Sequence, residues 1–91
     1  MTQINISQIK KVLKLVANDV KESTIDNLLT EETLLEKLQI DSLKFIELVV
    51  ELEQEFNVEI SDEYLIAENF ESISRIEELL VEINDKQILK G

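Results

Sequence analysis

The sequence predicts a small all-α bundle with three main helices, one short helix and a long first loop. Apolar residues recur at the spacing of a helical face in three segments, around residues 6–20, 42–56 and 73–84. No segment alternates apolar and polar residues strongly enough to predict a strand. The chain has 91 residues, which is the size of one domain with a small core. We therefore expect a single domain over residues 1–91, ordered from about 4 to 85, with 86–91 frayed.

The first helix is predicted over residues 6–20, with Asn5 or Ser7 as its N-cap. Its apolar stripe contains Ile6, Ile9, Val12, Leu13, Val16 and Val20. A long polar connection over residues 21–40 follows, with one short helical turn expected through Leu38. The leucines that would anchor this connection to the core are Leu28, Leu29, Leu34, Leu35 and Leu38. A connection this long is usually functional or disordered, and its regular leucines argue against disorder.

The central helix is predicted over residues 42–56, with Asp41 or Ser42 at its N-cap. One face should enter the core, and it contains Phe45, Leu48, Val49, Leu52 and Phe56. A second apolar stripe, rotated away from this face and bordered by Glu47 and Glu51, contains Leu43, Ile46 and Val50. A helix that is buried on one side needs only one stripe, so the second indicates a docking surface. The alternative is that the second stripe packs beneath the 21–40 connection.

Two further elements follow the central helix. Residues 57–60 are predicted to form a short extended link. Ser61 is expected to cap a brief helix over about 62–67, and Phe70 is expected to enter the core. The last helix is predicted over about 73–84. Its buried stripe contains Ile73, Ile76, Leu79, Leu80 and Ile83.

Acidic residues are concentrated in the middle of the chain. The chain carries nine basic and twenty acidic residues, a formal net charge of −11, and residues 41–71 hold ten of the acids with a single lysine. Such a field repels nucleic acid and anionic membranes, and it attracts basic patches on proteins. We expect protein partners, no nucleic-acid or membrane partner, and a monomer. The plain alternative is that the acid only keeps a small protein in solution.

The composition removes most routes to catalysis, and we do not expect an enzyme. The chain has no cysteine and no histidine, so it lacks a thiolate nucleophile, the commonest general base and the usual zinc ligands. No metal site is expected beyond weak surface binding of divalent cations by acids such as Glu51 with Glu55. No apolar run reaches the length of a signal peptide or a membrane span, so a cytoplasmic location is expected.

Ser42 has three interpretations. As a nucleophile it would need a base and an oxyanion hole, and no histidine is present to serve as that base. As an N-cap it would be an ordinary serine in front of an amphipathic helix. As an attachment point it would hold a phosphate close to free backbone N–H groups and the positive end of the helix dipole.

The residues around and after this serine resemble those of a known family. Asp41-Ser42-Leu43 is similar to the attachment motif of the acyl and peptidyl carrier proteins of fatty-acid, polyketide and nonribosomal peptide synthesis. Glu47-Leu48-Val49, residues 52–56 and residues 59–63 follow at the family's spacing. The resemblance extends over about residues 33–83.

The resemblance implies an acyl carrier protein. Ser42 would be esterified to 4′-phosphopantetheine, which a phosphopantetheinyl transferase takes from coenzyme A, and Asp41 and Leu43 would flank the attachment. The thiol of this arm would carry acyl or aminoacyl groups as thioesters between biosynthetic enzymes. Loading ligases or transferases and synthases with basic docking patches would be its other partners. Their docking surface would contain Leu43, Ile46, Glu47, Val50 and Glu51.

Three positions depart from the family's pattern. Gln39 stands three residues before the serine, where the family usually has glycine, and Ser61 stands where proline is common. Lys44 follows the attachment motif, where carriers of primary fatty-acid synthesis often have an acidic residue. Lys44 and Phe45 are more similar to discrete carriers of secondary-metabolite pathways. The alternative function is an acidic helical interaction module that has no covalent cofactor.

Overall fold

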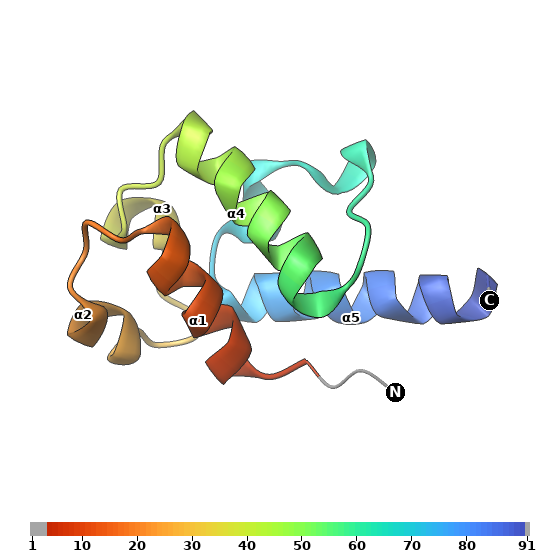
Figure 1. Cartoon of the computed structure of the whole chain (residues 1–91), viewed down its shortest axis with the longest axis horizontal. Coiled ribbons are helices and arrows are strands. Elements are labelled where there is room, and N and C mark those ends of the chain that lie inside the picture. Colours follow the sequence, from red (N-terminus) through yellow and green to blue (C-terminus); the bar gives the residue numbers. More distant parts are fainter. Residues whose placement is uncertain (1–3, 91) are drawn as a thin grey trace.

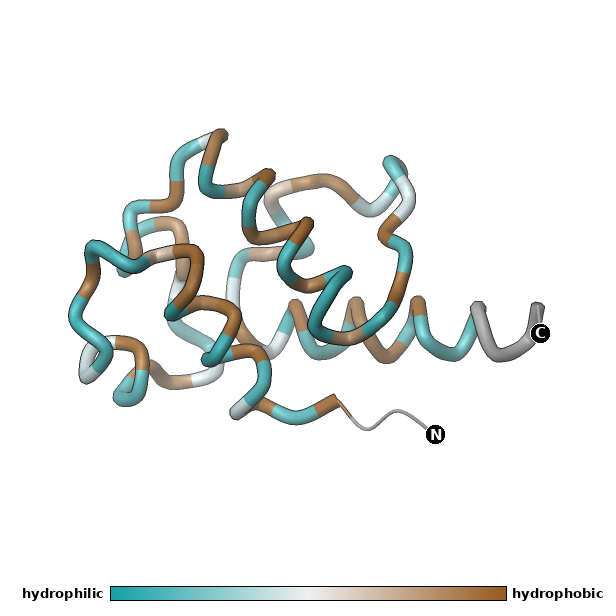
Figure 2. Tube along the Cα trace, viewed as in Figure 1, coloured by the Kyte–Doolittle hydropathy of each residue, from teal (hydrophilic) through white to brown (hydrophobic). Residues whose placement is uncertain are grey.

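Three long helices, α1 (Ile6–Val16), α4 (Ser42–Phe56) and α5 (Ile73–Lys90), form the body of the structure (Figure 1). The computed structural model describes residues 4–90, with side chains described from 4 to 86. Every regular element in this part of the chain is helical, which confirms the predicted all-α class. Apolar and polar residues alternate along the long helices about once per turn, as expected for helices with one buried side (Figure 2). None of the described helices has the length and apolar content needed to cross a membrane.

The start of α1 follows the sequence prediction. Asn5 is the N-cap, and its side-chain oxygen accepts a hydrogen bond from the Gln8 N–H at 3.0 Å. This bond satisfies one of the free backbone donors of the first turn. The predicted stripe enters the core through Ile9, Val12, Leu13 and Val16.

The end of α1 differs from the prediction, because the helix stops at Val16 and not at Val20. Ala17 leaves the helical region with φ −99° and ψ 56°, and residues 18–19 form a turn. Asparagine and aspartate favour such turns because their side chains compete for backbone hydrogen bonds. Val20 still packs against the core from beyond the turn, which explains why the apolar pattern continues past the end of the helix.

The 21–40 connection contains two short helices, α2 (Glu22–Asp26) and α3 (Leu34–Lys37), where the sequence predicts one turn. Only one residue of α2 is buried, so a five-residue helix of this kind leaves no periodic pattern to read. Leu28, Leu34 and Leu38 are buried as predicted, whereas Leu29 is exposed and does not anchor the loop. Two backbone hydrogen bonds tie the connection to the start of α5: Leu34 N–H to Glu71 O at 2.8 Å, and Ser74 N–H to Thr30 O at 2.9 Å.

α4 has the bounds that the sequence predicts. Leu48, Val49, Leu52 and Phe56 are buried. Phe45, the fifth member of the predicted core face, is half-buried and packs edge-to-face on Phe70, with ring centroids 5.1 Å apart. The helix ends at Asn57, which has φ 53°, a left-handed conformation that asparagine tolerates better than most residues.

The segment between α4 and α5 contains two single 3₁₀ turns, η1 (Asp62–Tyr64) and η2 (Ala67–Phe70), where the sequence predicts one brief helix over 62–67. Ser61 holds the cap position of η1, but its side chain makes no capping hydrogen bond. The extended link is fixed instead by Glu53, whose carboxylate accepts a hydrogen bond from the Ile60 N–H at 2.8 Å. Phe70 is buried as predicted.

α5 is longer than predicted. The whole predicted stripe is buried, from Ile73 to Ile83, but the helix continues past Asn84 to Lys90. No glycine or proline interrupts the segment before Gly91, so nothing in the sequence stops the helix. Lys86 helps to hold this extension, because its ammonium donates a hydrogen bond to the Tyr64 hydroxyl and lies 5.1 Å from the Tyr64 ring centroid. The domain limits remain a prediction, and Gly91 lies outside the described residues.

Candidate functional site

Between α3 and Ser42 the chain makes a tight turn at Gln39. Gln39 has φ 50°, in the left-handed region, and the Ile40 N–H reaches back to the Leu35 carbonyl at 3.3 Å. This bond and the left-handed residue are features of the Schellman motif that commonly ends helices, and glycine is the usual residue at the left-handed position. Glutamine therefore adopts here the conformation for which glycine is favoured, and the turn directs the following residues toward the start of α4.

Asp41, and not Ser42, caps α4. The Asp41 Oδ1 atom accepts a hydrogen bond from the Lys44 N–H at 2.9 Å, and Ser42 is the first helical residue. Ser42 is exposed, and its hydroxyl makes no hydrogen bond within the described residues. The hydroxyl therefore lies at the N-terminus of a 15-residue helix and does not stabilise the fold through a hydrogen bond.

An open surface hollow of about 240 Å³ lies beside Ser42. Its lining comes from α3, the link between α3 and α4, the start of α4 and the first residue of η2, and consists of Leu35, Ile40, Asp41, Ser42, Phe45 and Ala67. Most of these side chains are apolar, whereas Asp41 and Ser42 supply polar atoms. Such a surface accepts an alkyl or amide chain that starts at the serine.

The second stripe of α4 is exposed. The exposed fraction is 66% for Leu43, 60% for Ile46 and 42% for Val50. Glu47 is exposed beside them and Glu51 is half-buried. The alternative interpretation, in which the 21–40 connection covers this stripe, is therefore wrong. An exposed apolar group bordered by carboxylates is typical of a protein interaction surface.

Lys44, the single basic residue of segment 41–71, is paired across the structure with Asp19. Its Nζ atom donates to Asp19 Oδ1 at 2.7 Å, which joins the first turn of α4 to the turn that follows α1. The hydrogen bond to Asp19 raises the pKa of Lys44, and the same bond lowers the pKa of Asp19. Both charged forms are therefore favoured near neutral pH.

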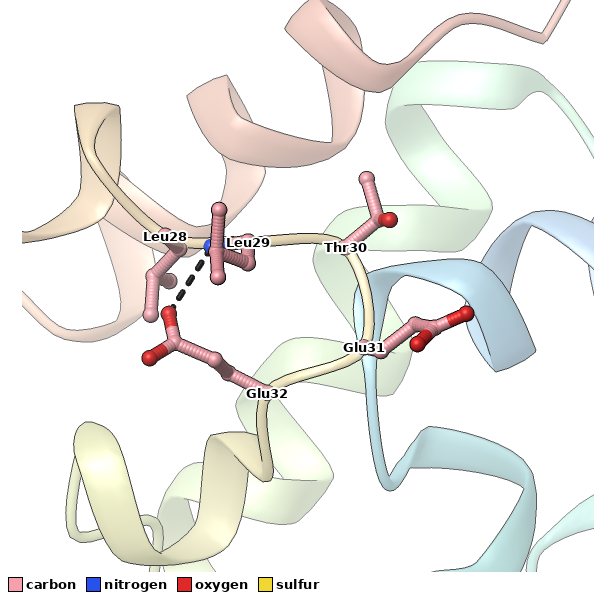
Figure 3. A pocket seen from close by; sticks show the side chains of 5 residues that line it. All are labelled: Leu28, Leu29, Thr30, Glu31 and Glu32. Carbon is pink, nitrogen blue, oxygen red and sulfur yellow. Dashed lines mark hydrogen bonds between the residues drawn. The ribbon is translucent and has the colours of Figure 1, made fainter.

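A second hollow lies in the loop between α2 and α3 (Figure 3). It measures about 450 Å³ and is lined by residues 28–32. The Glu32 carboxylate accepts a hydrogen bond from the Leu29 N–H at 2.8 Å and so closes the loop on itself. All of its lining comes from this one loop, and it contains no residue of α4, so we do not assign it to the Ser42 site.

Comparison with known proteins decides the family. The family described as the phosphopantetheine attachment site matches residues 8–80. The chain belongs to the phosphopantetheine-binding carrier proteins. It is 40% identical over 72 residues to the "Acyl carrier protein" of Buchnera aphidicola subsp. Baizongia pistaciae, which covers 78% of this chain and 87% of the relative. It is 42% identical over 60 residues to the "Acyl carrier protein homolog" of Mycoplasmopsis pulmonis, covering 66% and 75% of the two chains.

A third relative matches over almost the whole chain. The "Acyl carrier protein" of Thermosynechococcus vestitus is 32% identical over 83 residues, which is 91% of this chain and 96% of the relative. Membership in the carrier family confirms the resemblance identified in the sequence and implies a covalently attached 4′-phosphopantetheine. The interaction module without a covalent cofactor is not favoured by this membership.

The structure brings together the residues that the sequence singled out. Asp41, Ser42 and Leu43 form the first turn of α4, and Ile46, Glu47, Val50 and Glu51 follow on its outer side. Sequence reasoning missed the hollow beside Ser42 and the partner of Lys44. Asn18-Asp19 is a turn signal that could have placed Asp19 at a loop, but no pattern along the chain brings that loop to α4.

Proposed function

We propose that Ser42 carries the 4′-phosphopantetheine arm. The observation that carries the proposal is the division of roles at the start of α4: Asp41 caps the helix, so the neighbouring hydroxyl is exposed and has no hydrogen bond to lose. The motif Asp41-Ser42-Leu43 within the region of the family match supports the same residue. The hollow beside Ser42 fits the arm, because it offers apolar surface next to the point of attachment.

The modification transfers the 4′-phosphopantetheine part of coenzyme A to this serine. The Ser42 oxygen attacks the phosphorus that bears the pantetheine, the P–O bond to the other phosphate breaks, and adenosine 3′,5′-bisphosphate leaves. The serine proton passes to a base of the transferase. The resulting anionic phosphodiester lies at a helix N-terminus, where an exposed negative charge gains about 0.3–1 kcal/mol. This contribution suits a covalent group, because it is too small to hold a ligand by itself.

The chain itself contributes presentation and recognition. The arm supplies the thiol on which acyl or aminoacyl groups are carried, a group that a chain without cysteine lacks. Leu43, Ile46 and Val50, with the carboxylates of Glu47 and Glu51, form the proposed docking surface for the transferase and for loading and synthase enzymes with basic patches. Electrostatic docking suits a shuttle, since it speeds encounter and adds little to affinity at exposed pairs.

We further propose that the protein is not an enzyme and that it serves as a discrete carrier of a secondary-metabolite pathway. The pathway proposal rests on Lys44 and Phe45, which differ from the pattern of primary fatty-acid carriers. Loading assays with purified fatty-acid, polyketide and aminoacyl-loading enzymes test it. Efficient elongation by a complete primary fatty-acid synthase would contradict it. The cytoplasmic location expected from the sequence stays a prediction.

The attachment is tested by intact mass after incubation with coenzyme A and a broad-specificity phosphopantetheinyl transferase. We expect one phosphopantetheinyl group on the wild-type protein and none on Ser42→Ala. Ser61→Ala is the matched control, because Ser61 is also exposed and also precedes a helical turn. This control should be modified like the wild type. No gain on the wild type, or an equal gain on Ser42→Ala, overturns the proposal.

A further inference from the structure

α1 and α4 lie side by side and run in opposite directions (Figure 1). Two ion pairs mark the ends of their shared edge. Lys11 Nζ lies 3.4 Å from Glu55 Oε1 at one end, and Lys44 Nζ lies 2.7 Å from Asp19 Oδ1 at the other. The opposite edge of α1 faces α2, because Lys10 and Lys14 both bond to Asp26.

Leu15 lies on the α4 edge, between these two ion pairs. It follows Lys11 by one helical turn and therefore shares its side of α1. Glu51 precedes Glu55 by one turn on α4, so the antiparallel arrangement places Leu15 and Glu51 at the same level. Leu15 is 56% exposed, in contrast to the other apolar residues of the second half of α1, which are buried.

The carboxylates nearest to this level are the ones without a directly bound lysine. Within the described residues, Glu55 and Asp19 are each bound to a lysine, whereas Glu51 takes part in no ion pair and Glu47 has only a longer-range attraction to Lys44. Negative charge is therefore paired directly with lysine at the two ends of the edge and has no direct partner in its middle, at Glu51 above all. Apolar side chains lie on both sides of that charge, with Leu15 on α1 and the exposed stripe on α4.

We propose that Leu15 belongs to the docking surface, which thus spans α1 and α4, and that its occupant is the face of the phosphopantetheinyl transferase. This inference rests on the proposed function of Ser42. Charge complementarity identifies the chemistry of that face: an apolar side chain that covers Leu15, flanked by lysine or arginine that pairs with Glu47 and Glu51. Leu15 is a positioning residue, since it lies on a different helix from the reacting hydroxyl.

The position of Leu15 distinguishes it from other exposed leucines. Single apolar side chains on a protein surface are common and need no function. Leu29 is such a residue: it is 69% exposed, but it lies in the α2–α3 loop and lines a hollow to which α4 contributes no residue (Figure 3). Leu29 therefore provides a control of the same residue type and of similar exposure.

The test compares initial rates of modification by a broad-specificity transferase with coenzyme A, for the full chain and its variants. Truncation of an interface side chain of this size is expected to lower kcat/KM about five- to tenfold in Leu15→Ala. The loss should appear in KM, because docking and not bond formation is affected. Leu15→Met, which keeps the apolar volume, should restore most of the rate, and Leu29→Ala should match the wild type.

The outcomes separate the two proposals. Failure of the wild type to accept the arm overturns the function assigned to Ser42. Normal modification of the wild type with equal rates for Leu15→Ala and Leu29→Ala overturns the inference about Leu15 alone. Methyl NMR of the wild-type protein mixed with transferase and no coenzyme A gives a second readout that needs no variant. Leu15 signals should shift with those of Ile46 and Val50, and unchanged Leu15 signals contradict the inference.

Discussion

Replacement of Gln39 by glycine should stabilise this carrier. Gln39 has φ 50° in the turn that ends α3, and its exposed side chain makes no hydrogen bond within the described residues. Removal of the side chain therefore takes away steric strain and no favourable contact. The turn also sets the direction in which Ile40 and Asp41 lead into α4, so the change tests the geometry on which Ser42 depends.

The magnitude follows from two opposing terms. A residue with a Cβ atom loses about 1–2 kcal/mol in the left-handed region relative to the right-handed one. Glycine removes this loss but gives the unfolded chain more freedom, which costs about 0.5–1 kcal/mol. We expect Gln39→Gly to raise the free energy of unfolding by about 0.5–1 kcal/mol, or the Tm by about 2–8 °C for a domain of this size.

The assay is thermal and urea unfolding followed by circular dichroism, with two controls. Gln39→Ala keeps the Cβ atom and should gain nothing. Asn57→Gly, at the other left-handed position with φ 53°, should gain less than Gln39→Gly, because asparagine already tolerates this conformation. A Gln39→Gly variant no more stable than Gln39→Ala would contradict the assigned conformation of the loop before Ser42.

Three further outcomes are expected. Asp41→Ala should lower the free energy of unfolding by about 1 kcal/mol, because the Lys44 N–H loses its acceptor, while Asp41→Asn should keep most of the stability in urea unfolding. The hydrogen bond with Lys44 lowers the pKa of Asp19 from 3.8. The stabilisation of the fold by this ion pair is therefore complete above pH 3.8 and is lost as the pH falls through the lowered pKa. The Tm difference between wild type and Asp19→Asn should therefore be present at pH 7 and absent at the acid end of a pH series; a constant difference would exclude the pair as its cause. Salt and divalent cations should raise the Tm of a chain with net charge −11, and a Tm independent of both would contradict a dominant role for acidic repulsion.

The long amphipathic helices were predictable because a buried helix face requires apolar residues at regular spacing along the sequence. α4 is correct to its terminal residues, since a polar cap and a continuous apolar face define it, although Asn57, which was expected in an extended link, is left-handed. The same sequence also separated its exposed stripe from its buried face. The second carboxylate-bordered stripe was informative because its residues lie too far around the helix to enter the same core.

Short elements and helix ends were not predictable in this way. α2 buries only Ile25, so it leaves no periodic pattern, and α1 stops before Val20 although the apolar pattern continues. Contacts between distant segments were also missing, because spacing along the chain does not show that Asp19 reaches Lys44. In the sequence Leu15 is recognisable only as an apolar residue outside the buried stripe of α1. The antiparallel packing of α1 on α4 is what places it beside the exposed side of α4.

The hydroxyl of Ser42 takes no part in holding the fold together, because its neighbour Asp41 performs the capping. The bare and the proposed loaded form should therefore share one fold, and their free energies of unfolding should differ by no more than the roughly 0.3–1 kcal/mol that a negative charge gains at the helix N-terminus. An enzyme that distinguishes the two forms therefore has to bind the attached arm itself, because the surface of the polypeptide differs little between them. With Ser42 as the proposed attachment point, the polypeptide can fold before it is modified, and one reaction at its surface makes it ready to carry acyl groups.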